Sequence, residues 1–358
     1  MRPRRRSVVL VVALVAAGCS QLGLVPINLP SPGREPLEGF GAQTKGGEGG
    51  RVITISEPTE DAVRTAFTEA AASGNAIVRF DVKQPIAIVN KLPILTKPNL
   101  TIEGNGATLD GAGMKEGSAV VDIRTNDVIV RDLRVRNGDD NIRVDGPEAY
   151  RVVLTHVSST GAHDDGVSIG YGAHDVTLQW SLVAGATRSV YCKYPGTTNI
   201  SLHHSWLQKG AIRSPIFSGS IVADMRNVIV EDWGQWGSRF EDGASGNVVS
   251  SLFALSPYAV SVGGKPHAAL RIKGAGPVYV KDNLVRGAAE PLVAGTSAAP
   301  IAAPPVKTFG VKEMEKLVRA RAGCLPRDAV DAAYVAATAG WRVSETEPLR
   351  LAPGAAPR

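Results

Sequence analysis

The spacing of strand-like segments constrains the fold of this 358-residue chain more than any other feature. Eight segments begin at a turn or a polar residue and continue with alternating apolar side chains. They start at positions 99, 127, 151, 175, 199, 227, 247 and 277, so successive starts differ by 28, 24, 24, 24, 28, 20 and 30 residues. This repeat length predicts a solenoid, because one such unit is too small to bury its own apolar face.

Parallel stacking of these units predicts an all-β parallel β-helix, with Val, Ile and Leu side chains inward and turns outward. Leucine-rich repeats have a similar period, but their LxxLxLxxN pattern is absent, and an antiparallel sandwich would not give three consecutive spacings of 24. The chain has 39 glycines and only 5% aromatic residues. That composition favours many short strands joined by tight turns over a helical bundle.

One early segment, SEPTEDAVRTAFTEAAAS (56–73), departs from the strand pattern. Thr59 is its expected N-cap, two acidic residues follow, and apolar residues recur at helical spacing until Gly74. These features predict an amphipathic helix. We expect the helix to cover the open end of the first coil, whose unpaired edge would otherwise promote aggregation.

From about residue 288 the sequence is rich in Ala and Pro, and helical patterns follow at 311–321 and 327–338. We expect these helices to pack on the far end or on the side of the solenoid. The sequence thus divides into a β-helix domain at 39–290 and a C-terminal segment with short capping helices at 291–358.

The N-terminus has the features of an export signal. A basic MRPRRR is followed by a short apolar run that ends in LVAAGCS, and small residues directly before a cysteine resemble the lipobox of bacterial lipoproteins. The resemblance implies that residues 1–18 are removed and that Cys19 is acylated, so that the protein is exported and held in the cell envelope. An ordinary secretion signal or a short membrane anchor is the alternative. Proline-rich residues 19–38 are the expected tether.

The net charge of +5 comes mainly from this N-terminus, which holds four arginines and no acid. Without these arginines, 35 basic residues face 34 acidic ones, and no Lys/Arg stripe runs through the body. We therefore do not expect nucleic-acid binding. Three cysteines cannot form a disulfide framework; Cys192 and Cys324 either pair with each other or are buried thiols.

Three pieces of the sequence concentrate charged side chains: GDDNIRVD (138–145), AHDDGVSIG (162–170) and KGAIRSPIFSG (209–219). They lie about one repeat or two repeats apart, so stacked coils would make them neighbours on one outer face. The first two are acidic and the third contains Arg213. This juxtaposition predicts binding of a divalent cation and, through it, of an acidic sugar chain.

Several motifs, in the same order, resemble polysaccharide lyases of the pectate lyase type. They are GFGAQTKGGEGG followed by RVITI, NLTIEGNGATLDGAG, HDDGVSIGYGAHDVTLQWS, NISLHHSWLQKGAIRSPIFSG and the tail KLVRARAGCLPRDAVDAAYV, which together span residues 39–340. The resemblance implies a right-handed parallel β-helix that cleaves polygalacturonate by β-elimination with calcium. Such a cation would withdraw charge from the uronate carboxylate while a basic side chain removes the adjacent C5 proton.

The same resemblance assigns individual residues. Asp140 falls on a calcium-ligating position, and Asp164 and Asp165 match a second acidic position. Arg213 falls on the proton acceptor and Lys193 on a substrate-binding basic residue.

Two further expectations concern neighbouring positions. We expect His163 to line the groove and contact substrate. Ser168 and Ser218 stand where the family often has another acid and a second arginine, which leaves the corresponding contacts missing.

Two other functions stay open. A glycoside hydrolase on the same scaffold would use paired carboxylates, for which Asp140, Asp164 and Asp165 are candidates. A non-catalytic surface protein that binds carbohydrate would keep the fold without the chemistry. His156, His203 and His204 lie within strand patterns and are best explained as core or ladder residues. We expect the protein to act as a monomer.

Overall fold

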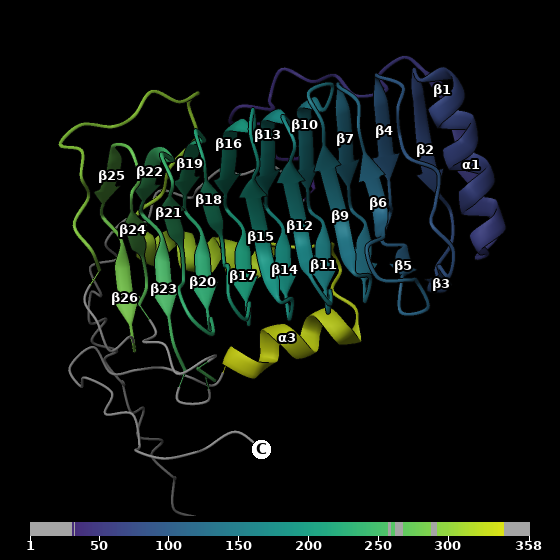
Figure 1. Ribbon diagram of the computed structural model, residues 1–358. Helices are drawn as coiled ribbons and strands as arrows, with labels where there is room; N and C mark the ends of the chain where they lie inside the picture. The colour runs from purple at the N-terminus through teal and green to yellow at the C-terminus, as the bar shows by residue number, and fades with distance from the viewer. Residues whose placement is uncertain (1–30, 32, 257–258, 262–267, 288–291, 340–358) are drawn as a thin grey trace, which may run out of the picture.

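The computed structural model describes residues 31, 33–256, 259–261, 268–287 and 292–339. These residues form a right-handed parallel β-helix, as the repeat and the resemblance predicted. Most coils contribute one strand to each of three parallel sheets, so the sheets run side by side along the whole stack (Figure 1).

The strands of each sheet follow one another along the stack. Sheet A contains β1 (Arg51–Ile55), β2 (Ala76–Phe80), β4 (Leu100–Glu103), β7 (Val128–Arg131), β10 (Tyr150–Thr155), β13 (His174–Gln179), β16 (Thr198–His203), β19 (Val222–Arg226), β22 (Ser245–Val249) and β25 (Val278–Lys281). Sheet B contains β3 (Ile86–Ala87), β5 (Thr108–Asp110), β8 (Arg134–Arg136), β11 (Ser158–Thr160), β14 (Leu182–Ala184), β17 (Trp206–Gln208), β20 (Ile229–Glu231), β23 (Leu252–Ala254) and β26 (Leu284–Arg286). Sheet C contains β6 (Ala119–Ile123), β9 (Asp140–Asp145), β12 (Asp165–Gly170), β15 (Arg188–Lys193), β18 (Ile216–Ser218), β21 (Arg239–Glu241) and β24 (Arg271–Lys273).

The register of sheet A corrects one repeat. The segment starting at 227 was expected to align with its neighbours, but it leads into β20 of sheet B. In sheet A, Ile200 is paired with Ala223 and Ala223 with Gly246, so both spacings are 23 residues. The apparent spacings of 28 and 20 arose because the apolar alternation of β20 is as strong as that of β19 and only the register separates them.

Polar residues that precede strands adopt the left-handed backbone conformation. Asn99 and Asn199 have φ values of 59° and 55°, and Asp175 has a φ of 53°. Their side chains bond to those of the previous coil: Asn99 Nδ2 donates to Asn75 Oδ1 at 2.8 Å, and Asn199 Nδ2 donates to Asp175 Oδ1 at 2.8 Å. Turn geometry therefore accounts for these residues, because Asn and Asp tolerate positive φ better than other residues with a side chain.

The predicted helix is present as α1 (Glu60–Ser73). The Thr59 hydroxyl accepts a hydrogen bond from the Ala62 N–H, and Gly74 ends the helix with a φ of 62°. Buried apolar side chains face β1 and β2 at the N-terminal end of the stack (Figure 1). The helix thus covers the first coil, as expected.

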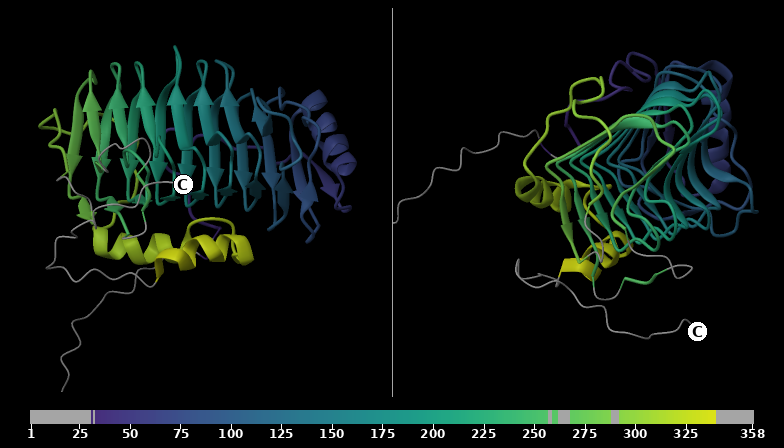
Figure 2. Two further views of the ribbon diagram at one scale, coloured as in Figure 1. Left: turned by 60° about the horizontal axis from the view of Figure 1, so that its bottom comes forward. Right: turned by 60° about the vertical axis from the view of Figure 1, so that its left-hand side comes forward.

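The C-terminal helices are α2 (Val311–Arg321) and α3 (Ala329–Ala339). They lie along the side of the stack against sheet B and do not close its end (Figure 2), so the description of them as capping helices was wrong. Met314 and Val318 of α2 join a buried apolar cluster with Trp206 and Ile229 on the outer surface of sheet B. The helices bury an apolar outer surface there, and the end of a coil stack offers no comparable strip.

An N-terminal strap, residues 33–50, runs along the outer face of sheet A. Its backbone N–H groups donate to side chains of successive coils: Glu38 to Gln179 Oε1 at 3.1 Å, Phe40 to Ser201 Oγ at 3.0 Å and Gly41 to Thr177 Oγ1 at 2.9 Å. A Cβ on Gly41 would lie 2.5 Å from the Val152 carbonyl oxygen, so this close approach requires glycine.

The remaining sequence expectations for buried residues have mixed outcomes. Cys192 and Cys324 are free, buried thiols, so they do not pair. His156, Trp180 and His204 stack on one another at the same turn of consecutive coils, as expected for ladder residues. Cys19, together with residues 1–18 and most of the tether, lies outside the described residues. Among the helices that are described, none is long and apolar enough to cross a lipid bilayer.

Candidate active site

Sheet C brings charged residues from four coils into one column. Asp165 and Arg188, the first residues of β12 and β15, are paired in register. The register of β9 and β12 places Asp140 beside Asp165, and the Asp165 N–H donates to Asp140 Oδ1 at 3.1 Å. Arg213 follows as the bridge partner of Arg188. The column therefore runs Asp140, Asp165, Arg188, Arg213, with one residue on each successive coil.

Three carboxylates meet at one end of this column. One oxygen from each of Asp140, Asp164 and Asp165 lies within 4.8 Å of the other two. Asp140 and Asp165 are each only 3% exposed, whereas the Asp164 side chain is 42% exposed. The structure thus brings together the three acidic residues that the sequence proposed as metal ligands.

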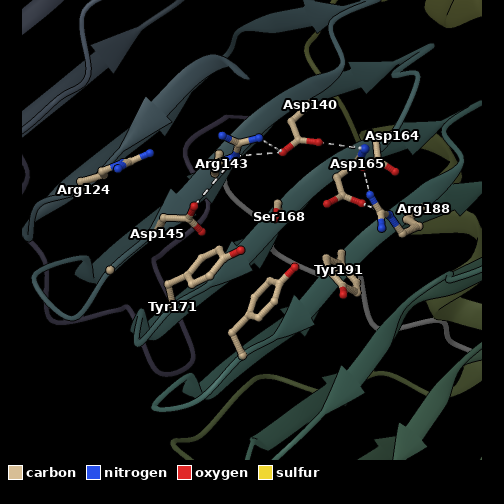
Figure 3. Close-up of a pocket in the computed structure, with 12 residues that line it drawn as sticks. Arg124, Asp140, Arg143, Asp145, Asp164, Asp165, Ser168, Tyr171, Arg188 and Tyr191 are labelled. Carbon is tan, nitrogen blue, oxygen red and sulfur yellow. Dashed lines mark hydrogen bonds and ion pairs between the residues drawn. The ribbon is translucent and has the colours of Figure 1, made fainter. Parts of the chain in front are cut away.

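Two arginines of the same chain pair with these carboxylates. Arg143 Nη2 lies 2.6 Å from Asp140 Oδ2, and Arg188 forms ion pairs with both Asp164 and Asp165 (Figure 3). Sequence reasoning missed both arginines. For Arg188 a signal was available, because it follows Asp165 by 23 residues and precedes Arg213 by 25, which is the spacing of one coil in each direction.

Burial and mutual repulsion shift the ionisation of this cluster. The pKa of Asp165 is raised to about 8, first by burial and then by the charge of Asp140, although the Ser168 hydroxyl and Arg213 oppose the shift. The pKa of Arg188 is lowered, first by burial and then by the neighbouring Arg213 guanidinium. The cluster therefore holds more buried charge than its own pairs neutralise, which is typical of functional sites.

The carboxylates open onto a groove of about 460 Å³. Arg124 and Asp145 line its far side, and Tyr171, Tyr191 and Tyr194 line its floor and rim (Figure 3). The Tyr171 and Tyr194 rings stack with centroids 4.0 Å apart, and Tyr171 is 56% exposed. We call this hollow the Asp–Arg groove. It combines charges of both signs with exposed aromatic rings, a surface suited to a polar, charged sugar chain.

No model of a known protein family matches the chain. Among curated proteins, "Probable pectate lyase C" of Emericella nidulans is 29% identical over 231 residues, which cover 62% of this chain and 52% of that protein. Among solved structures, a pectate lyase from a Bacillus species in complex with trigalacturonate has a TM-score of 0.64 at 15% identity, covering 80% of this chain and 98% of that one. Pectate lyase C of Erwinia chrysanthemi, solved with Ca²⁺, has a TM-score of 0.53 at 14% identity and covers 82% and 99%.

The chain has the fold of the pectate lyases. It spans about half the length of the curated relatives it matches. The Asp–Arg groove lies on sheet C of this pectate lyase fold.

Arg213 lies one coil beyond the carboxylates. Its guanidinium is 5.0 Å from the centre of the Tyr191 ring, and the Arg188 guanidinium is 4.7 Å from the same ring. The Arg213 Nε atom is buried and has no hydrogen-bond partner among the described residues. Two arginines thus share one aromatic face, where each makes protonation of the other less favourable.

The other sequence-predicted residues lie around this centre. Lys193, at the end of β15, shares a rung with Gly170 and does not line the Asp–Arg groove. His163 is exposed and lines a neighbouring hollow of about 440 Å³ together with Asp139 and Asp164.

The two serines at positions of departure differ in their surroundings. Ser168 lines the groove, whereas Ser218 is 1% exposed and donates to Asp242 Oδ2 at 2.8 Å. Position 218 is therefore closed to substrate in this pectate lyase fold.

The three carboxylates fit a hard divalent cation. They offer oxygen atoms only, close together and partly exposed through Asp164, which is the donor set that calcium prefers. Arg188 currently supplies the counter-charge for two of them. A cation at this position would have to replace that arginine.

Proposed function

We propose that this protein is a polysaccharide lyase that cleaves polygalacturonate or a related acidic polysaccharide by β-elimination, with calcium. The observation that carries the proposal is the column on sheet C, where Asp140, Asp165, Arg188 and Arg213 occupy consecutive coils beside the Asp–Arg groove. The pectate lyase fold and the curated relatives named pectate lyase support it.

Arg213 is the proposed base. It accepts the proton from C5 of a uronate; the C5–H electrons form a C4–C5 double bond, and the C4–O bond breaks as the leaving oxygen takes a proton. An arginine is ordinarily protonated, so the site must favour its neutral form. The adjacent Arg188 charge, the shared Tyr191 ring and the unpaired buried Nε all act in that direction.

Asp140, Asp164 and Asp165 would hold the calcium ion. When bound, calcium neutralises the uronate carboxylate and makes the neighbouring C5 proton more acidic. The chain's own contribution is an exchange of partners: Arg188 leaves Asp164 and Asp165 and becomes available to a substrate carboxylate in the groove. Lys193 and His163, at the margins of the site, would contact neighbouring sugar residues.

The proposal includes export and attachment to the cell envelope through an acylated Cys19. The lipobox-like LVAAGCS carries this part. Growing cells with a clickable fatty acid should label the protein and place it in the membrane fraction, whereas Cys19→Ala should lose the label and leave the membrane. Label retained on the Cys19→Ala protein would exclude this anchor.

A product assay separates the lyase from its alternatives. We expect polygalacturonate incubated with the protein to gain the ultraviolet absorbance of an unsaturated uronide in calcium, and to lose that gain in chelator. New reducing ends without absorbance would identify a hydrolase, and retention on the polymer without either product would identify a binding protein. A hydrolase is less well supported, because the carboxylate oxygens lie within 4.8 Å, closer than the about 5–5.5 Å and about 6.5–9.5 Å separations of glycosidases.

A further inference from the structure

A second group of metal-ligating side chains lies on sheet A, beneath the N-terminal strap. One carboxylate oxygen of Glu38 and one ring nitrogen each of His203 and His204 lie within 4.8 Å of one another. Both histidines are fully buried, and Glu38 is half-buried. This group contains two imidazoles, whereas the cluster on sheet C offers oxygen atoms only.

The fold assembles this group from parts that are distant in sequence. His203 is the last residue of β16 and is paired with Gln179, whose side-chain oxygen accepts from the Glu38 N–H. His204 has a φ of 49°, which turns its ring onto Trp180 at a centroid distance of 4.3 Å. The two rings meet at 87°, with their Nδ1 atoms 2.9 Å apart. The strap and one coil are thus both required for the site.

The hydrogen bonding of the two rings is incomplete in the metal-free protein. Their mutual Nδ1 contact needs one N–H and one lone pair, and so uses one nitrogen of each ring. Within the described part of the chain, neither Nε2 atom makes a hydrogen bond of good geometry, although the Glu38 carbonyl is close enough to favour the protonated form of His203. Buried imidazole nitrogens without partners are costly, and a bound cation would supply a partner.

Electrostatics is consistent with a cation at this position. Burial lowers the pKa of His203 to about 4 and that of His204 well below its usual value, so both rings are neutral near pH 7. Burial also raises the pKa of the Glu38 carboxyl, although the Lys307 N–H opposes that shift. Neutral imidazole is the form that binds metal, and a divalent ion would compensate the buried carboxylate.

We propose that Glu38, His203 and His204 bind a zinc-like transition-metal ion that fastens the strap to the coil stack. Two imidazoles and one carboxylate form a donor set typical of Zn²⁺ and unlike that of calcium. Glu38 Oε1 also accepts from the Lys307 N–H at 3.2 Å, and the Phe309 ring packs edge-on against His204 at 5.6 Å. The ion therefore joins the strap, β16 and the segment that leads into α2.

The test uses the full chain without a histidine tag, stripped of metal with chelator and titrated with ZnSO₄ in a calorimeter. We expect about one zinc ion to bind per chain at micromolar concentration and to raise the midpoint of thermal unfolding. Because Asp165→Asn disables the carboxylate cluster on sheet C, zinc binding that survives in this variant belongs to the sheet A site. Zinc binding that disappears with Asp165→Asn would overturn the proposal, as would an absence of zinc binding by the unaltered chain.

Two variants locate the ion. Glu38→Gln keeps the size of a half-buried side chain and should weaken zinc binding by about 10–100-fold, as should His203→Gln. The matched control is His174→Gln, which replaces a half-buried histidine of the same sheet that pairs with Asp175; it should bind zinc as the unaltered chain does. Unchanged affinity in Glu38→Gln would overturn the assignment, even if His203→Gln failed to fold.

Discussion

The outer faces of sheets A and C make opposite uses of the same geometry. On sheet A, outward polar side chains such as Thr177, Gln179 and Ser201 are covered by the strap and bond to its backbone. On sheet C, Asp165 and Arg188 occupy equivalent outward positions but pair with each other beside an open groove. A stacked coil supplies columns of outward side chains on every face, and the cover over a column decides its role.

This comparison has an energetic consequence. A covered column satisfies its polar groups with backbone partners that cannot leave, and so it contributes to stability. An open column holds charges whose partners can be exchanged for a ligand, and so it contributes to binding. Changes on sheet C should therefore alter activity with little loss of stability, and changes beneath the strap should do the reverse.

The largest expected effect tests the open face. Arg213→Ala should reduce lyase activity by about 10²–10⁴-fold, the usual contribution of a positioned acid or base, because no other side chain is placed to take the C5 proton. Its unfolding free energy should change by only about 0.5–1 kcal/mol, the value of its contact with Tyr191. Initial rates and urea denaturation measure the two quantities. The control is Arg79→Ala on sheet A, which should keep full activity; equal losses in both variants would contradict the assignment.

Glu35→Gln tests the covered face. Glu35 is buried, with Oε2 2.7 Å from His156 Nε2 and Oε1 2.9 Å from Arg321 Nε, so it joins the strap to a coil and to α2. Removing its charge should lower the unfolding free energy by about 3–5 kcal/mol, because buried cationic groups lose their counter-ion. Turnover at a temperature where the variant stays folded should be unchanged. A loss of turnover without a loss of stability would reverse the comparison.

Arg188→Ala tests whether the chain's own arginine competes with calcium. Asp164 and Asp165 lose their internal partner in this variant, so calcium affinity should rise, by about tenfold if one charged pair of about 1.4 kcal/mol is removed. Turnover should fall, because the same arginine is proposed to contact substrate. Calorimetric titration with calcium and a comparison of kcat with KM measure these effects. Unchanged calcium affinity would show that arginine and cation do not share the site.

Asp145→Asn gives a smaller effect that depends on pH. Burial raises the pKa of Asp145 to about 6, with a further contribution from Asp122, although Arg143 opposes the shift. The folded chain therefore holds this proton more tightly than the unfolded chain, and stability falls as pH rises between about 4 and 6. The asparagine variant should lack that decrease and should be more stable than the unaltered chain at pH 7 but not at pH 4. Denaturation at both pH values provides the check.

The smallest effect concerns Ser218. Because its hydroxyl is buried against Asp242, Ser218→Ala should cost about 1 kcal/mol of stability and leave KM unchanged. A raised KM would mean that this position reaches substrate after all.

The sequence by itself determined the solenoid, the helix that covers its first coil and the three carboxylates near Arg213. Those features follow from local patterns: a repeat close to 24 residues, a Thr59 cap with apolar residues at helical spacing, and acidic turns one coil apart. Residues one coil apart must become neighbours in a parallel stack, so period alone predicted that the acids and Arg213 share a face.

Only the tertiary structure decided which side chains pair. Coil lengths vary by a few residues, so the strand at 227 was assigned to the wrong sheet, and Arg188, between Asp165 and Arg213, was overlooked. The path of the strap and the position of α2 and α3 along sheet B were equally out of reach, because neither segment repeats. Periodicity specifies which residues stack, but charge pairing and covering depend on exact register and on contacts between distant segments, which a local pattern does not encode.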